Sequence, residues 1–315
     1  MKNPAYKDNP NGIWEQSITP YKGDNYVGSA VNTKFGDIIV AEPGGLTFYS
    51  RKNGLWTDPT TWSWTDYYTD DVPPRWPNSE TDIVRIGNNK IVDIPVNFND
   101  TVRTIYVEKD PVNNLPGRLN FLGNLGFIRG TTFVLEDDCT IGLQHLNGIT
   151  LTGQTGAIQT SIRHFGVSRY IYNSYEGSQQ TGAGLPDSIK CIIVDNPSAL
   201  GKAVFISRDV GSTLKVRDSV LINQGFLSFG NRNLKLYGSL VLDSVINNGT
   251  IFPLPTITEF AGNNQKYIVL NNRTGLSLID IHLSGGDTKV LRTKINNAQT
   301  QHVRFSGVMD FTAPS

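Results

Sequence analysis

A run of very short apolar segments between Leu214 and Leu242 constrains this chain more than any other feature. Mostly glycine and polar residues separate the segments. Within each segment apolar and polar residues alternate, as they do in a strand that is buried on one face. The predicted strands are Leu214–Val216, Val220–Ile222, Phe226–Phe229, Leu234–Leu236 and Leu240–Leu242.

The same run contains a short repeat. Leu214 recurs as Leu234, and Leu221 recurs as Leu240 or Val241. Three short strands in a repeat of roughly 20 residues are typical of a parallel β-helix, in which each coil stacks on the one before it. Glycine and asparagine supply the left-handed backbone conformations that tight bends need. We therefore predict an all-β chain that forms a right-handed parallel β-helix.

Composition excludes several classes of partner. The 315 residues include 28 lysines and arginines and 28 aspartates and glutamates, so the chain has no net charge. Without a basic stripe we expect no nucleic-acid partner. No apolar run approaches the length of a membrane span, so we expect no membrane insertion. The first residues have no apolar signal-peptide core, and we predict that the chain is a processed or excised piece of a longer protein.

The sequence divides near residue 45. Residues 1–45 are predicted to form an N-terminal arm or linker with one strand, Asp37–Ala41, and residues 46–315 the β-helix domain. Trp14 and Tyr21 offer apolar surface, so the arm is predicted to lie against the β-helix or a neighbour. A disordered lead-in is the alternative.

Aromatic residues crowd into residues 46–80. They include Trp56, Trp62, Trp64, Tyr67, Tyr68 and Trp76. The first interpretation is an aromatic N-terminal cap, because the open end of a solenoid exposes an apolar interior. The second is a glycan contact through Trp62, Trp64, Tyr67 and Tyr68, because flat rings match the apolar faces of sugars.

Further strands are predicted at Ile83–Ile86, Ile91–Ile94 and Val102–Val107. Residues 152–190 are polar and irregular, and we predict a long loop insertion there that contains Tyr170, Tyr172 and Tyr175. Such loops frequently carry binding sites.

Two segments resemble a known family. Residues 53–107 contain NG-W-TDP-TTW-S, then P-x-x-x-D-I-V-R-I, K-I-V-D-I and V-R-T-I-Y-V, and residues 258–270 contain EFAGNNQKYIVL. They resemble large adhesin-like surface proteins secreted by Bacteroidetes, and the first is also similar to the extracellular G8 module. The resemblance implies an extracellular or cell-surface β-helix exported by type 9 secretion. The insertion WTDYYTDDVPPRWP, the first 45 residues and the missing C-terminal sorting domain depart from that pattern.

Four Asp-Ser/Thr-apolar triplets, the O-glycosylation pattern of such exported proteins, begin at residues 100, 187, 218 and 243. Ordinary composition gives roughly one by chance. Their candidate acceptors are Thr101, Ser188, Ser219 and Ser244. The alternative is that Asp-Ser/Thr makes a suitable corner before an apolar strand.

No catalytic, cofactor-binding or metal-binding residues are predicted. The carboxylates of Glu136, Asp137 and Asp138 are adjacent but lack the further oxygen ligands that calcium needs. Arg208-Asp209 and Arg217-Asp218 are predicted to be solvated corners, and the four histidines have no zinc spacing. Cys139 and Cys191 form either one disulfide or two buried thiols.

These features predict a structural or adhesive module of a secreted or cell-surface protein. It would be a rigid stalk or display segment that contacts surface glycans or other surface or secretion proteins, and it would not be an enzyme. Two alternatives remain: a carbohydrate-active β-helix enzyme (a polysaccharide lyase or glycoside hydrolase) and a segment of a phage or appendage fibre.

Overall fold

Residues 45–196, 203–241 and 257–261 are described with their side chains in the computed structural model, and further strands before and after them by their backbone. The chain divides into two compact units, Met1–Leu46 and Thr47–Ser315.

Five strands are described in the first unit. β1 (Asn3–Lys7) pairs antiparallel with β2 (Glu15–Gln16) and with β5 (Asp37–Ala41), and β3 (Pro20–Gly23) forms a hairpin with β4 (Tyr26–Ser29). The sequence predicted only the last of the five, because the other four lack a clear alternation of apolar residues. Trp14 lies outside the described residues, as does the side chain of Tyr21.

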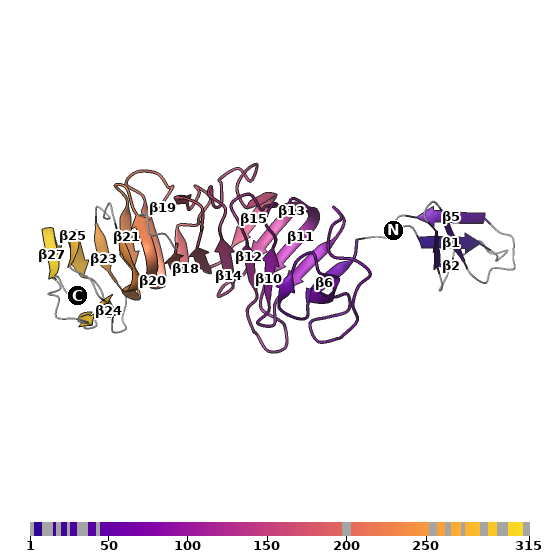
Figure 1. Ribbon diagram of the computed structural model, residues 1–315, viewed down its shortest axis with the longest axis horizontal. Coiled ribbons are helices and arrows are strands. Elements are labelled where there is room, and N and C mark those ends of the chain that lie inside the picture. The colour runs from indigo at the N-terminus through magenta and orange to yellow at the C-terminus, as the bar shows by residue number, and fades with distance from the viewer. Residues whose placement is uncertain are drawn as a thin grey trace. The chain divides into compact units, whose positions relative to one another are not determined.

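The second unit contains two mainly parallel sheets, whose strands follow one another in Figure 1. The six-stranded sheet has the order β15-β13-β11-β9-β6-β8, and only its β6–β8 pair is antiparallel. Its strands are β6 (Thr47–Ser50), β8 (Trp62–Ser63), β9 (Ile83–Ile86), β11 (Thr101–Val107), β13 (Ile128–Leu135) and β15 (Ile158–Phe165).

The sixteen-stranded sheet is parallel at every described pair. Its main path is β7 (Gly54–Leu55), β10 (Ile91–Ile94), β12 (Arg118–Phe121), β14 (Thr140–Leu143), β16 (Arg169–Tyr172), β18 (Ser188–Asp195), β20 (Thr213–Ser228), β21 (Asn233–Leu236), β23 (Thr258–Phe260), β25 (Gly275–Leu283) and β27 (His302–Asp310). Beside this path lie β17 (Gln179–Gln180), β19 (Ala203–Phe205), β22 (Ser239–Ile251), β24 (Lys266–Asn271) and β26 (Lys289–Lys294).

From β9 to β16 the chain alternates between the two sheets. Each strand from β9 to β14 therefore pairs with the strand two places further along the chain. The number of residues between paired positions varies along the sheets. The stretch of chain from Leu214 to its partner Leu234 is shorter than that from Thr140 to its partner Arg169. The all-β prediction is confirmed, together with the Leu214–Leu234 pairing.

The short strands in the Leu214–Leu242 run are partly merged. The first three predicted segments, apart from Phe229, lie within the single strand β20, whose pairing shifts register between Ile222 and Gln224. Leu221 pairs with Val241, one of the two predicted partners. A strand can continue through a bend when a bulge absorbs the change of direction.

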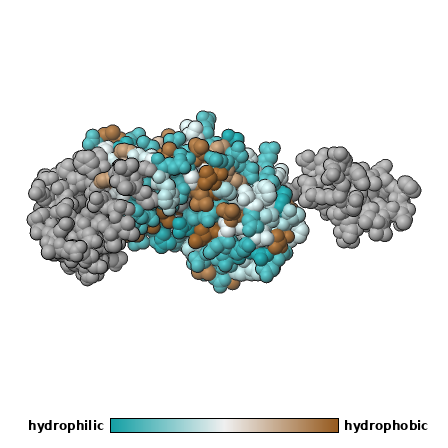
Figure 2. Space-filling model, viewed as in Figure 1, coloured by the Kyte–Doolittle hydropathy of each residue, from teal (hydrophilic) through white to brown (hydrophobic). Residues whose placement is uncertain are grey.

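Side chains alternate between the interior and the surface along these strands. β9, β10, β12 and β21 all show the same pattern, in which every second residue is buried. Full burial of each aliphatic side chain contributes roughly 1.5–3 kcal/mol. On the face seen in Figure 2, hydrophilic residues cover most of the described surface and hydrophobic residues form separate groups.

The aromatic region is anchored by two buried tryptophans. Trp56 and Trp62 are fully buried and pack edge to face, with ring centroids 5.2 Å apart. Trp56 Nε1 donates to the carbonyl of Pro77 at 2.8 Å, and Trp62 Nε1 donates to the carbonyl of Trp56 at 2.8 Å. A 3₁₀-helix (Pro59–Thr61), the only helix among the described residues, is N-capped by Asp58 between them.

The predicted loop insertion over residues 152–190 is wrong in large part. β15, β16, β17 and the first residues of β18 lie within it, and Tyr170 and Tyr172 are fully buried. The alternation of inward and outward residues is hard to recognise in the sequence, because β16 is short and its outward residues are Arg169 and Ile171. The polar composition of the segment reflects its solvent-facing side and not an absence of strands.

No helix of the described residues is both long and apolar enough to cross a membrane.

Candidate functional site

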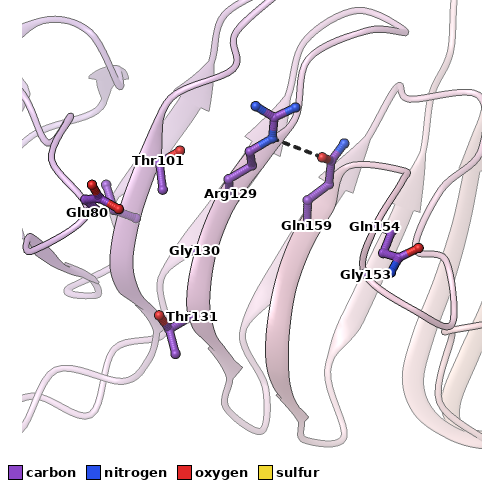
Figure 3. Close-up of a pocket in the computed structure, with 9 residues that line it drawn as sticks. Glu80, Thr101, Arg129, Gly130, Thr131, Gly153, Gln154 and Gln159 are labelled. Carbon is purple, nitrogen blue, oxygen red and sulfur yellow. Dashed lines mark hydrogen bonds between the residues drawn. The ribbon is translucent and has the colours of Figure 1, made fainter.

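A shallow open groove of about 500 Å³ lies across the first halves of β11, β13 and β15. We call it the polar groove. Figure 3 shows it with Glu80 and Gln154 at opposite sides of the view. It is lined by Glu80, Thr101, Val102, Arg129, Gly130, Thr131, Gly153, Gln154 and Gln159.

Three side chains form a row across the polar groove. Thr101 pairs in register with Arg129, and Arg129 pairs with Gln159. Because paired residues of parallel strands lie on the same face, all three side chains stand on the same side of the sheet (Figure 3). The row offers a hydroxyl, a guanidinium and an amide to one ligand.

Arg129 is held in one orientation from two sides. Its Nε donates to Gln159 Oε1 at 3.3 Å, and its guanidinium carbon lies 4.7 Å from the centre of the Phe127 ring. This leaves the two terminal nitrogens without a partner among the described residues. An arginine fixed in this way loses little side-chain entropy when it binds a ligand.

The segment 149–156 walls the polar groove beside β15. A β-bridge between Ile149 and Gly156 closes its base, and Thr150 Oγ1 donates to the carbonyl of Thr155 at 2.6 Å. Arg163 donates to the carbonyls of Thr150 and Leu151. These hydrogen bonds satisfy backbone carbonyls of the turn, in which Gly153 and Gly156 have positive φ.

The floor of the polar groove depends on a close approach of two strands. A Cβ atom at Gly130 would lie 2.4 Å from the carbonyl oxygen of Val102. Only glycine fits there without a shift of β11 or β13.

A second groove, of about 600 Å³, lies where β13 and β15 end. We call it the corner groove. Its charged and aromatic lining residues are Lys109, Glu136, Asp137, Arg163, His164 and Phe165. Glu136 Oε2 accepts from the backbone N–H of Lys109 at 2.9 Å, and Asp137 Oδ1 accepts from that of Val167 at 2.6 Å. Both carboxylates therefore already accept hydrogen bonds from the backbone of neighbouring connections.

Asp138 joins two lysines beside the corner groove. Its carboxylate accepts from Lys109 Nζ at 2.7 Å and also from Lys190. These two bonds lower the pKa of Asp138 to about 2, because they stabilise the charged carboxylate. Asp138 thereby links the connection after β11, the connection before β14 and strand β18.

The structure separates the four predicted aromatic glycan contacts. Trp62 is fully buried and Tyr67 is 3% exposed, so neither offers a ring face to a sugar. Trp64 and Tyr68 are each 47% exposed. The rings of Tyr67 and Tyr68 are tilted by 73° and do not form one flat surface. Only Trp64 and Tyr68 remain available from this set, because the others pack into the interior.

The candidate glycosylation residues occupy different surroundings. Thr101 lines the polar groove, Ser188 accepts from Arg217 Nε at 3.1 Å, and Ser219 Oγ lies 3.3 Å from Cys191 Sγ. The side chain of Ser244 lies outside the described part of the chain.

The two cysteines are free and buried. Burial raises the pKa of the Cys139 thiol to about 12, and burial also raises the pKa of Cys191. Of the two open alternatives, the structure has the thiols, and at neutral pH both are protonated and inert. Among the described residues, no group of three or more histidine, cysteine or acidic side chains could hold a metal ion.

The sequence did not single out Glu80, Arg129 or Gln159. The stretch of chain from Thr101 to its partner Arg129 differs in length from that between Arg129 and its partner Gln159. An unequal repeat of this kind hides the row until the strands are aligned. Comparison with protein-family models, curated proteins and solved structures finds no match to this chain.

Proposed function

We propose that residues 47–315 form a right-handed parallel β-helix that acts as a rigid extracellular or cell-surface module for binding glycans. The alternation of β9 to β16 between two parallel sheets supports the β-helix, because a chain that winds in stacked coils follows this path. In this proposal Trp56 and Trp62 belong to an aromatic cap over the first coil. The resemblance to adhesin-like secreted proteins supports the location.

The row of Thr101, Arg129 and Gln159 in the polar groove carries the proposal. Sugars present many hydroxyl groups, each able to donate and to accept a hydrogen bond. The groove is open along the sheet, so an extended polymer fits better than a small enclosed ligand. Side chains from three neighbouring strands would contact successive parts of that polymer.

A glycan-array and polysaccharide-binding screen tests this function. The wild-type chain is compared with Thr131→Trp, which places a large side chain at the exposed rim of the polar groove. The control is Trp64→Ala with Tyr68→Ala. We expect binding to at least one polymer, its loss in Thr131→Trp and its retention in the control. Binding to none, or loss only in the control, would contradict the proposal.

A carbohydrate-active enzyme is the second candidate, and the corner groove favours it. Glu136, Asp137 and His164 line that groove, and paired carboxylates can act as acid and base in glycoside cleavage. The same screen, run for degradation, separates the two functions. Turnover that disappears in Asp137→Asn would replace the binding module with an enzyme.

A further inference from the structure

We propose that the polar groove recognises a polysaccharide with anionic substituents, and that Arg129 binds the carboxylate or sulfate group. This inference rests on the proposed function and names the chemical class of the glycan. It follows from the state of one guanidinium and from the charge that surrounds it.

The Arg129 guanidinium is prepared for an oxyanion. Phe127 supports its flat face and Gln159 fixes its Nε, while its terminal nitrogens point away from β13 in Figure 3. A guanidinium donates two parallel hydrogen bonds to a carboxylate or sulfate, and these are about twice as strong as neutral ones. A neutral polymer would offer the two terminal nitrogens only hydroxyl groups as hydrogen-bond acceptors.

A second arginine reinforces the positive charge. Arg103 is exposed on β11 between Val102 and Thr104, whose partners on β13 are Gly130 and Thr132. It therefore lies diagonally from Arg129 on the neighbouring strand. In the part of the chain described with side chains, neither arginine makes an ion pair. These two cations on adjacent strands outnumber Glu80, the carboxylate in the groove lining, and so attract an anionic chain.

Arg217 provides a matched control. It is exposed, its guanidinium carbon lies 4.6 Å from the centre of the Tyr237 ring, and its Nε donates to Ser188 Oγ at 3.1 Å. The local arrangement repeats that of Arg129, but no residue of the polar groove is near it in sequence or register. Replacement of either arginine by alanine removes the same charge.

The test measures binding of the full chain to polygalacturonate, dextran sulfate and neutral dextran in moderate salt. We expect an anionic polymer to bind at least tenfold more tightly than dextran. Arg129→Ala should weaken that binding about tenfold, because charge-assisted hydrogen bonds are lost, and Arg129→Lys should weaken it less. Arg217→Ala should stay within about twofold of wild type, since only screened long-range charge is lost. Melting temperatures verify that each variant is folded.

Each outcome decides the inference. Binding of polygalacturonate names a carboxylate and binding of dextran sulfate alone names a sulfate ester, and both support it. Equal losses in Arg129→Ala and Arg217→Ala would show unspecific charge attraction and overturn it. Neutral dextran that binds as well as the anionic polymers, is blocked by Thr131→Trp and is unaffected by Arg129→Ala would overturn it while leaving the glycan-binding function intact. Binding to no polymer, here and on the array, would overturn both.

Discussion

The polar-groove region and the β18–β22 region use the same parallel pairing but present different outer faces. In the first, the outward row is Thr101, Arg129 and Gln159. In the second, Ile193 pairs with Leu221 and Leu221 with Val241, so an outward row is aliphatic and half-buried. The strands therefore set the spacing of outward side chains, and the residues on them decide whether a row can bind a polar ligand.

The two regions also differ in the chain between their strands. The segment 149–156 stands beside the polar groove as a wall and is fastened by Arg163. The connection from β20 to β21 contains only Phe229–Arg232, with Gly230 and Asn231 at positive φ. A connection this short cannot form a wall beside the strands. A groove thus needs a longer connection as well as a polar row.

The mutations with the largest expected effect should lower the free energy of unfolding by similar amounts in the two regions. Phe133 of β13 is fully buried and Leu234 of β21 is 1% exposed. Phe133→Ala should lower the free energy of unfolding by about 3–5 kcal/mol and Leu234→Ala by about 2–5 kcal/mol, through lost burial and the cavities left behind. Urea unfolding measures both. A loss below about 1 kcal/mol at either position would break the assumption of equally packed interiors.

Removal of the Arg163 hydrogen bonds to the wall segment should affect the polar-groove region but not the β18–β22 region. Arg163→Ala leaves the carbonyls of Thr150 and Leu151 without their donor. Because each of the two lost bonds is worth about 1 kcal/mol, we expect roughly thirtyfold faster amide exchange over residues 149–156 and weaker polymer binding. The control is Arg208→Ala, which removes a donor to the carbonyl of Leu185. Unchanged exchange over 149–156 in Arg163→Ala would contradict the role of the wall.

Acid should weaken one contact in the part of the fold that carries the two grooves. The pKa of Asp138 is lowered to about 2 in the folded chain by its bonds to Lys109 and Lys190. A lowered pKa stabilises the fold above the ordinary aspartate value of 3.8, and that contribution fades as the pH falls toward 2.

The Asp138 side chain is 38% exposed, so Asp138→Asn should cost less than about 1 kcal/mol at pH 7 and almost nothing near pH 2. Unfolding free energies of the variant and of Asp209→Asn, an exposed control, are compared at the two pH values. A cost for Asp138→Asn that does not change with pH would show that charge is not the cause.

The smallest expected effect refines the charge of the polar groove. Glu80 is the one carboxylate that lines it and it is exposed. Glu80→Gln removes a repulsion that solvent largely screens, so affinity for an anionic polymer should rise only about twofold. Calorimetry at low salt measures the change. A fall in affinity would mean that Glu80 accepts hydrogen bonds from the ligand.

The sequence predicted the strands with clear alternation and missed those without it. β9 and β10 have the predicted bounds, and Leu214 pairs with Leu234 as expected. β16 was hidden because its inward residues are tyrosines within a polar segment, so composition outweighed a short alternation.

The candidate site was less predictable than the strands. Aromatic residues that attract attention in a sequence can lie in the interior, as Trp62 does. Arg129 and Gln159 are ordinary surface residues that acquire meaning only through the register in which β13 and β15 pair. Local sequence patterns are enough to predict the strands, whereas the groove depends on pairing between segments that are distant in the sequence.

Hydrogen–deuterium exchange with and without a polygalacturonate oligomer shows directly which strands bind the polymer. We expect protection in the first halves of β11 and β13, in β15 and in the wall segment 149–156. β20 to β22, which share the pairing but lack a groove, should exchange as they do in the free chain. Protection over Trp64–Tyr68 or over β20 to β22, with none at Arg129, would show that the polar groove is not the binding site.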